Sequence, residues 1–210
     1  MFMINGYDIY SLGIMSAFIS FLGFCLENIW LAATKGFIDN RNMRLPFLMG
    51  YGVLVTGMYA VFGTPDNMTM LSGNAVTSDR TGRLILYFFV SMLIVTAGEL
   101  ILGHFTERFF GFEYWNYSRL PFHITKYTSV PTSIGFALVI TLFMDVCFAP
   151  VMSVIQSINA DSMQSVSIML TAVIGIDTFL GFRQMKRNRG LNIRWIKYIA
   201  NVNEPVPENA

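Results

Sequence analysis

Four carboxylates lie inside long apolar stretches of this chain, and they are the residues best able to do chemistry: Glu27, Glu99, Asp145 and Asp177. A charge near the centre of a bilayer costs at least about 2.5–3.5 kcal/mol on insertion scales, so each acid needs a structural or a functional reason. Glu27, Glu99 and Asp177 fall towards the same ends of their segments, and Asp145 falls near the middle of its own. We therefore expect a polar pocket that collects them, although each could instead pair with a neighbour or reach interfacial water.

Basic and aromatic residues that could complete this pocket stand in two short connecting stretches. Arginines there could neutralise the acids or hold an anionic headgroup. The aromatic residues could stack on a ligand or form an ordinary interfacial belt. The predicted ligand-binding residues are Glu27, Glu99, Asp145, Arg41, Arg44, Trp115, Tyr117 and Arg119.

The elements that must position these residues are membrane-spanning helices. Hydrophobic residues make up 54% of the 210 residues and charged residues only 13%. Segments of about 20 apolar residues are long enough to cross a bilayer, and helices satisfy their own backbone there. The predicted fold is an all-α integral membrane bundle of about five transmembrane helices, at 10–33, 45–63, 84–108, 133–158 and 163–185.

Two of the connecting stretches are nearly the same sequence. Residues 36–47 align without a gap on residues 111–122, with six identities in twelve positions, including a shared Arg-Leu-Pro-Phe. Each stretch follows an apolar segment with one buried-looking glutamate, Glu27 in the first and Glu99 in the second. Each also precedes another apolar segment. This pattern favours two parallel-related helical hairpins plus one extra helix, and binding sites of membrane proteins often form where such repeats meet.

The basic residues predict the orientation. Twelve Lys and Arg fall in the connections and tail on one side, and only Arg80 and Arg83 fall on the other. The positive-inside rule then places the N-terminus outside and the C-terminus in the cytoplasm, in a membrane that we expect to be the bacterial cell membrane. Residues 1–187 form the predicted transmembrane domain. Residues 188–210 are expected to be a cytoplasmic interfacial helix, over 191–199, and a loose tail.

Several chemistries find no motif here. There is no P-loop, no Gly-x-Ser-x-Gly and no dinucleotide fingerprint. His104 and His123 are isolated from zinc-type spacings, and Cys25 and Cys147 sit in apolar segments as core residues would. We therefore assign no catalytic residue, no metal and no cofactor. We expect no binding of nucleic acid.

The chain resembles a known family in two blocks. The first runs from Glu27 through Asn40-Arg41 to Gly50-x-Gly52. The second comprises Glu99, Phe110-Gly111, Trp115-Asn116-Tyr117-Ser118 and Leu120-Pro121-Phe122. These blocks are similar to those of the CmpB-like family of small polytopic membrane proteins, described as "putative ABC-transporter type IV". The resemblance covers roughly residues 11–152 and leaves out the fifth span and the tail. Asn116 stands where the family usually has Asp, which weakens any role that needs that carboxylate.

The resemblance implies a small membrane protein, in which the membrane part of a transporter is one option. Together with the acids, it favours a transport-type or ligand-binding membrane subunit whose carboxylate-lined pocket opens to the cytoplasmic side. Two alternatives stay open: a non-catalytic partner or regulatory subunit, and an intramembrane enzyme acting on a lipid-like substrate. Enzyme activity is the less favoured interpretation. The expected partners are membrane lipid and either a second copy of the chain or a separate ATPase or membrane subunit.

Overall fold

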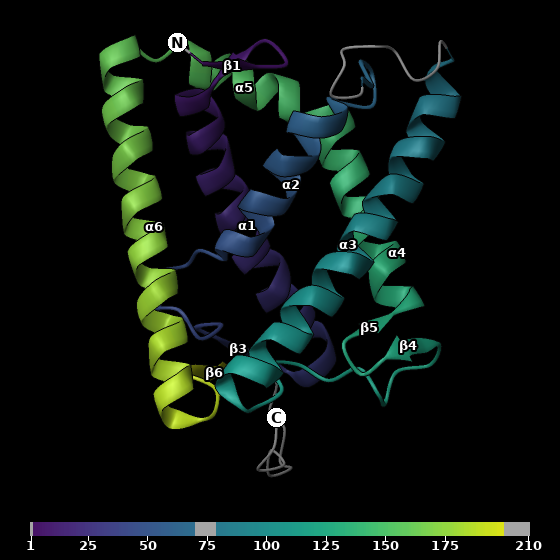
Figure 1. Ribbon diagram of the computed structural model, residues 1–210, viewed down its shortest axis with the longest axis vertical. Helices are drawn as coiled ribbons and strands as arrows, with labels where there is room; N and C mark the ends of the chain where they lie inside the picture. The colour runs from purple at the N-terminus through teal and green to yellow at the C-terminus, as the bar shows by residue number, and fades with distance from the viewer. Residues whose placement is uncertain (1, 70–78, 200–210) are drawn as a thin grey trace.

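The computed structural model describes residues 2–69 and 79–199, and these residues form an all-α bundle with three small antiparallel strand pairs (Figure 1). Four long apolar helical segments are long enough to cross a membrane: α1 (Ile9–Lys35), α3 (Arg80–Phe110), Val130–Gln156 and α6 (Ala160–Asn188). They correspond to four of the predicted spans. The chain is therefore a helical membrane protein, as its composition predicts.

The remaining helix, α2 (Met49–Phe62), is shorter than predicted. Its 14 residues extend about 21 Å at 1.5 Å per residue, below the roughly 30 Å of a hydrocarbon core. Residues 45–48 do not join it because their backbone is held elsewhere. The Leu48 N–H donates to the Ser20 carbonyl of α1, and the Leu45 N–H donates to Asp177 of α6. Of the five predicted spans, four are therefore long helices and one is the short helix α2.

The segment Val130–Gln156 contains a local irregularity around Asp145. It consists of α4 (Val130–Leu142), one π-helical turn η1 (Phe143–Cys147) and α5 (Phe148–Gln156). Pro150 lacks the N–H that would bond the carbonyl four residues earlier, so the turn before it must pair its backbone differently. A single π turn is a common solution. The backbone irregularity associated with Pro150 thus begins a few residues earlier, in the turn that contains Asp145.

The helices pack as two hairpins and one added helix. α1 packs on α2, α3 packs on α4, and α6 packs on α1. Small residues permit the closest approaches: Gly52 of α2 leaves no room for a Cβ beside Ser16 of α1. The hairpins meet at the stack of Tyr59 on Phe148, whose ring centroids are 4.5 Å apart. Figure 1 shows α1, α3 and α6 all finishing at its lower end, which we call the basic end because most Lys and Arg fall there.

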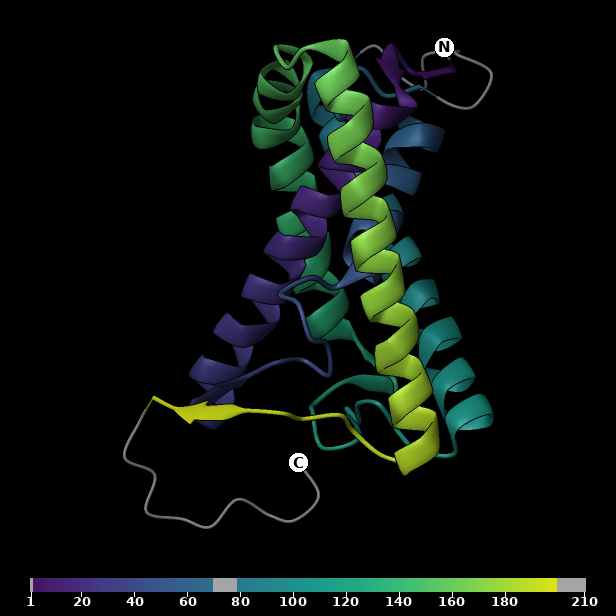
Figure 2. The same cartoon turned by 90° about the vertical axis from the view of Figure 1, so that its left-hand side faces the viewer.

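The three strand pairs are short. β1 (Met3–Ile4) pairs with β2 (Tyr7–Asp8) before α1, and β4 (His123–Thr125) pairs with β5 (Thr128–Ser129) before α4. At the basic end, β3 (Phe37–Asp39) pairs with β6 (Ile196–Tyr198) from the far end of the chain. Figure 2 shows β6 lying across the basic end of the bundle.

The interfacial helix predicted over 191–199 is wrong, because this segment is extended and contributes β6. α6 ends at Arg189, which adopts a left-handed backbone with φ of 47° and turns the chain back. The edge of β3 then pairs with the backbone of β6. A helix in this segment would instead have satisfied its backbone within itself. The predicted tail from residue 200 onward lies outside the described residues.

Candidate functional site

Charged and aromatic side chains from both hairpins gather at the basic end. We call this set the inter-hairpin cluster: Glu27, Asp39, Arg41, Tyr51, Glu99, Tyr114 and Tyr117. α1 supplies Glu27, the connection after it supplies Asp39 and Arg41, α2 supplies Tyr51, and the second hairpin supplies the rest. The cluster therefore depends on how the two hairpins pack together.

Glu27 is held by two partners. The Tyr51 hydroxyl donates to Glu27 Oε1 at 2.6 Å, and Arg41 Nη2 lies 3.4 Å from Oε2. The side chains of Arg41 and Glu27 are only 17% and 23% exposed, respectively. Gly23, one turn before Glu27, leaves no room for a Cβ against the Tyr51 ring. The glycine thus lets the tyrosine approach α1 closely enough to bond the carboxylate.

Arg41 is fixed by its own loop. Its backbone N–H donates to Asp39 Oδ1 at 2.7 Å, and its Nη1 lies 3.7 Å from the same oxygen. Burial lowers the pKa of the Arg41 guanidinium, but the carboxylates of Glu27 and Asp39 outweigh burial and raise that pKa overall. Arg41 is therefore a permanently charged group that faces two carboxylates.

Three buried asparagines hold this loop to the C-terminal segment, and we call them the asparagine clasp: Asn40, Asn42 and Asn192. The Asn192 backbone N–H donates to Asn42 Oδ1 at 2.8 Å, and its amide donates to the Asn42 carbonyl at 3.1 Å. The Asn40 amide donates to the Asn192 carbonyl at 3.0 Å. Arg41 and Asn42 both have positive φ, 43° and 66°, a conformation that the clasp maintains.

Asp177 anchors the same connection from α6. Its carboxylate accepts the backbone N–H groups of Arg44, at 3.0 and 3.2 Å, and of Leu45, at 2.9 Å. Gly181, one turn later, lies against Met43. A buried carboxylate that is satisfied by backbone donors has a structural explanation. The Arg44 side chain itself is exposed, so its backbone rather than its charge is used here.

The second hairpin covers the cluster through the connection between α3 and β4. The Tyr114 hydroxyl donates to the Arg41 carbonyl at 3.5 Å. Burial raises the pKa of the Tyr117 hydroxyl, and the nearby carboxylates of Glu99 and Glu27 add to that rise. The Tyr117 and Thr128 hydroxyls are hydrogen-bonding partners of Glu99. Glu99 and Glu27 therefore lie within electrostatic reach of each other across the hairpin interface.

Two polar atoms of the cluster have no partner among the residues that the structure describes. They are Glu99 Oε2 and Arg41 Nε, and both are buried. A buried polar group without a partner costs about 1–3 kcal/mol, and more when it is charged. One atom is an acceptor and the other is a donor. The cluster thus has unused capacity to bind, in contrast to the satisfied carboxylate of Asp177.

A similar contact occurs in the second hairpin, with Glu107 in the place of Glu27. Gly103 leaves no room for a Cβ against the Tyr127 ring, and the Tyr127 hydroxyl donates to Glu107. Lys126 Nζ lies 2.6 Å from Glu107 Oε1 and 2.8 Å from Glu113 Oε1. Sequence alignment paired Glu27 with Glu99 and missed this correspondence. The signal was a Gly-x-x-x-Glu in both helices.

The second contact differs from the first in exposure. The Lys126, Glu107 and Glu113 side chains are 34%, 43% and 38% exposed. Hydrogen bonds to the two acids raise the pKa of Lys126, and the bond from Lys126 lowers the pKa of Glu113. Exposed ion pairs contribute about 0.2–1 kcal/mol, whereas removing one partner of a buried pair costs about 3–5 kcal/mol. Charge therefore matters most in the inter-hairpin cluster.

Of the other predicted site residues, Trp115 borders the cluster, because its ring lies edge-on to that of Tyr114 with centroids 5.4 Å apart. Asp145 pairs with Arg80 at 3.1 Å, at the opposite end of α3, so the structure does not bring it to Glu27. Trp115 donates its indole N–H to the Tyr127 carbonyl at 2.7 Å, and Arg119 is exposed. Within residues 2–69 and 79–199, no three His, Cys, Asp or Glu side chains are placed to hold a metal.

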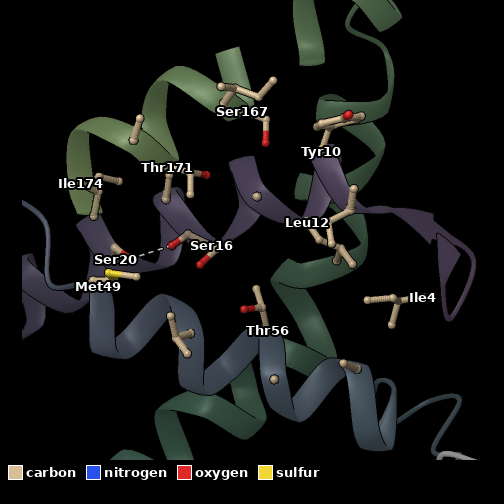
Figure 3. A pocket seen from close by; sticks show the side chains of 18 residues that line it. Ile4, Tyr10, Leu12, Ser16, Ser20, Met49, Thr56, Ser167, Thr171 and Ile174 are labelled. Carbon is tan, nitrogen blue, oxygen red and sulfur yellow. Dashed lines mark hydrogen bonds between the residues drawn. The ribbon is translucent and has the colours of Figure 1, made fainter. Parts of the chain in front are cut away.

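A groove of about 720 Å³ lies elsewhere, between α1, α2 and α6 (Figure 3). Its lining includes Ser16, Ser20, Thr56 and Ser167 but no acidic or basic residue. Figure 3 shows the Ser20 hydroxyl turned back to its own helix, where it donates to the Ser16 carbonyl at 2.8 Å. The groove lacks groups for proton or ion chemistry. The inter-hairpin cluster is thus the stronger candidate site.

Most of the chain matches a known family. The model of a family described as "Putative ABC-transporter type IV" matches residues 14–182. The match extends into α6, beyond the 11–152 over which the resemblance was noted. No curated protein and no solved structure matches the chain.

Proposed function

Because the chain belongs to the putative ABC-transporter type IV family of membrane proteins, we propose that it is a transport-type, ligand-binding membrane subunit whose site is the inter-hairpin cluster. The observation that carries the proposal is the pair of buried, unpaired atoms on Glu99 and Arg41, beside an ion pair that both hairpins enclose. Residues that only stabilise a fold normally satisfy such atoms.

The arrangement also supports a direction of access. The cluster lies at the basic end, and the positive-inside rule assigns such an end to the cytoplasm. A ligand would then enter from the cytoplasmic side, with the N-terminus outside. The matching Gly–Tyr–Glu contacts in the two hairpins favour parallel-related repeats with the site at their interface.

A partner completes this proposal. The sequence has no P-loop, so ATP-driven transport would need a separate ATPase subunit. The apolar groove of Figure 3 and the exposed small residues Gly50 and Gly57, which have open space around them, leave α2 free to pack against another helix. Membrane lipid, a second copy or another membrane subunit could occupy that position.

The proposal is tested by ligand-dependent stability of the purified full chain. Thermal unfolding is measured with a panel of amino acids, alkylammonium ions and phosphorylated compounds. A compound present at about 100 times its Kd should stabilise the wild type by about 2.7 kcal/mol. Arg41→Gln and Glu27→Gln should abolish that stabilisation, while Arg108→Gln, which changes an exposed arginine at the same end, should keep it.

Two results would contradict the proposal. Stabilisation that survives both cluster variants would place the ligand elsewhere. A partner protein that co-purifies in equal amounts, with no compound stabilising the chain, would instead favour a non-catalytic partner subunit.

A further inference from the structure

The charges of the inter-hairpin cluster do not balance. Among the residues that the structure describes, the cluster holds three carboxylates, those of Glu27, Asp39 and Glu99, but one guanidinium, that of Arg41. The other arginines predicted for this site, Arg44 and Arg119, have exposed side chains. Arg41 forms ion pairs with Glu27 and Asp39, so Glu99 is the carboxylate that it does not pair.

The groups that face Glu99 come from every element packed around it. Glu27 of α1 approaches with like charge, and Tyr117 of the following connection and Thr128 of β5 offer hydroxyl groups. Thr96 and Ser133, nearer the middle of the membrane, bond each other. None of these facing groups is a cation, apart from Arg41, whose charge Glu27 and Asp39 already share.

It is therefore costly to leave the Glu99 carboxylate ionised. Hydroxyl donors serve the carboxylate, but Oε2 is buried and has no partner among the described residues. An unpaired buried charge costs several kcal/mol, and carboxyl groups commonly avoid that cost by taking up a proton. The same reasoning does not apply to Glu107 of the same helix, because Lys126 and Tyr127 contact both its oxygens.

We propose that Glu99 is a proton-binding site, with the proton held on Oε2 when the hairpins are packed as they are here. The inference rests on the proposed function for its purpose, since a proton released beside Arg41 and Glu27 would couple ligand binding to pH. The step is a simple dissociation: the O–H bond of the carboxyl group breaks, the electron pair stays on Oε2, and the proton passes to water at the basic end.

The test is infrared difference spectroscopy of the ligand-free full chain in lipid, recorded between acidic and alkaline buffers in H₂O and in D₂O. The wild type should show a protonated carboxyl C=O band that shifts in D₂O and disappears at alkaline pH. Glu99→Gln should lack this band, and Glu107→Gln should retain it. If Glu99→Gln does not fold, Glu99→Asp keeps a carboxyl group and should move the band.

Stability provides an independent readout. Because Gln resembles the protonated acid, Glu99→Gln should keep its stability as pH rises, whereas the wild type should lose stability over the pH range in which unfolding releases the Glu99 proton. A wild type without the band, or a band unchanged in the Glu99 variants, would overturn the inference. Neither result depends on any ligand, so the proposed function would fail separately, in the stability panel described above.

Discussion

The close approach of Tyr51 to Gly23 gives a sharp prediction about how Glu27 is positioned. Gly23→Ala places a Cβ against the Tyr51 ring, at a position where the packing leaves no room for one. Overpacking costs about 1–3 kcal/mol, and loss of the hydroxyl bond to the carboxylate costs about 1.5–3 kcal/mol. Alanine returns about 0.5–1 kcal/mol of helix preference. The net expected destabilisation is therefore about 2–5 kcal/mol.

The assay is equilibrium unfolding in mixed detergent, compared with Gly135→Ala. Gly135 lies in α4 with open space around it, so its alanine variant should be neutral or slightly stabilised. Tyr51→Phe separates the two costs, because it keeps the ring and removes the hydroxyl. In that background Gly23→Ala should cost only the overpacking part less the helix preference of alanine, about 0–2.5 kcal/mol.

Two results would refute the reasoning. If Gly23→Ala costs no more than Gly135→Ala, the ring is not held against α1. If its cost is the same with Tyr51 and with Phe at that position, the close packing does not serve the bond to Glu27.

Three other predictions concern the loops of the basic end. Asp177→Asn should destabilise the chain by about 1.5–3 kcal/mol, because charged acceptors of backbone N–H groups are lost; chemical unfolding measures this, and an unchanged midpoint would contradict the anchoring role. Asn192→Ala should speed amide hydrogen exchange at Asn42, whose carbonyl loses the bond from the Asn192 side-chain amide, more than anywhere in α4; uniform exchange would contradict the clasp. Lys126 lowers the pKa of Glu113, so their bond stabilises the loop above the unfolded value of about 4.5 and is lost as pH falls through the folded value. At that low pH, proteolysis of residues 111–126 should accelerate in the wild type but not in Glu113→Gln. Equal rates in the two proteins would contradict the stabilising role of the bond.

The long helices could be predicted because apolar length and lipid thickness determine them almost alone. α2 could not, since its late start depends on Asp177, an acid that arrives about 130 residues later. Such a long-range bond leaves no local pattern. The gathering of Glu27, Arg41, Glu99 and Tyr117 followed from the expectation that the hairpins meet at one end.

Asp145 shows the opposite outcome for the same kind of reasoning. Its depth in an apolar segment suggested the shared pocket, but its partner Arg80 begins α3 at the other end. Nothing in the spacing of either residue announces that pair. The Glu107 contact was missed for a different reason. The alignment rested on the repeated Arg-Leu-Pro-Phe of the loops, whereas the contact that the two hairpins share depends on a Gly-x-x-x-Glu in their helices.

The asparagine clasp has a consequence for biosynthesis. Asn42 and Asn192 are separated by 150 residues, so the ribosome adds 150 residues after Asn42 before the two can meet. Until then Arg41 has no fixed conformation. Arg41 and Asn42 both adopt a positive φ in the folded chain, which such residues ordinarily avoid. The first hairpin can therefore insert into the membrane early, but the ion pair between Arg41 and Glu27 forms later. Formation of that pair requires that α6 and the segment after it are already in place.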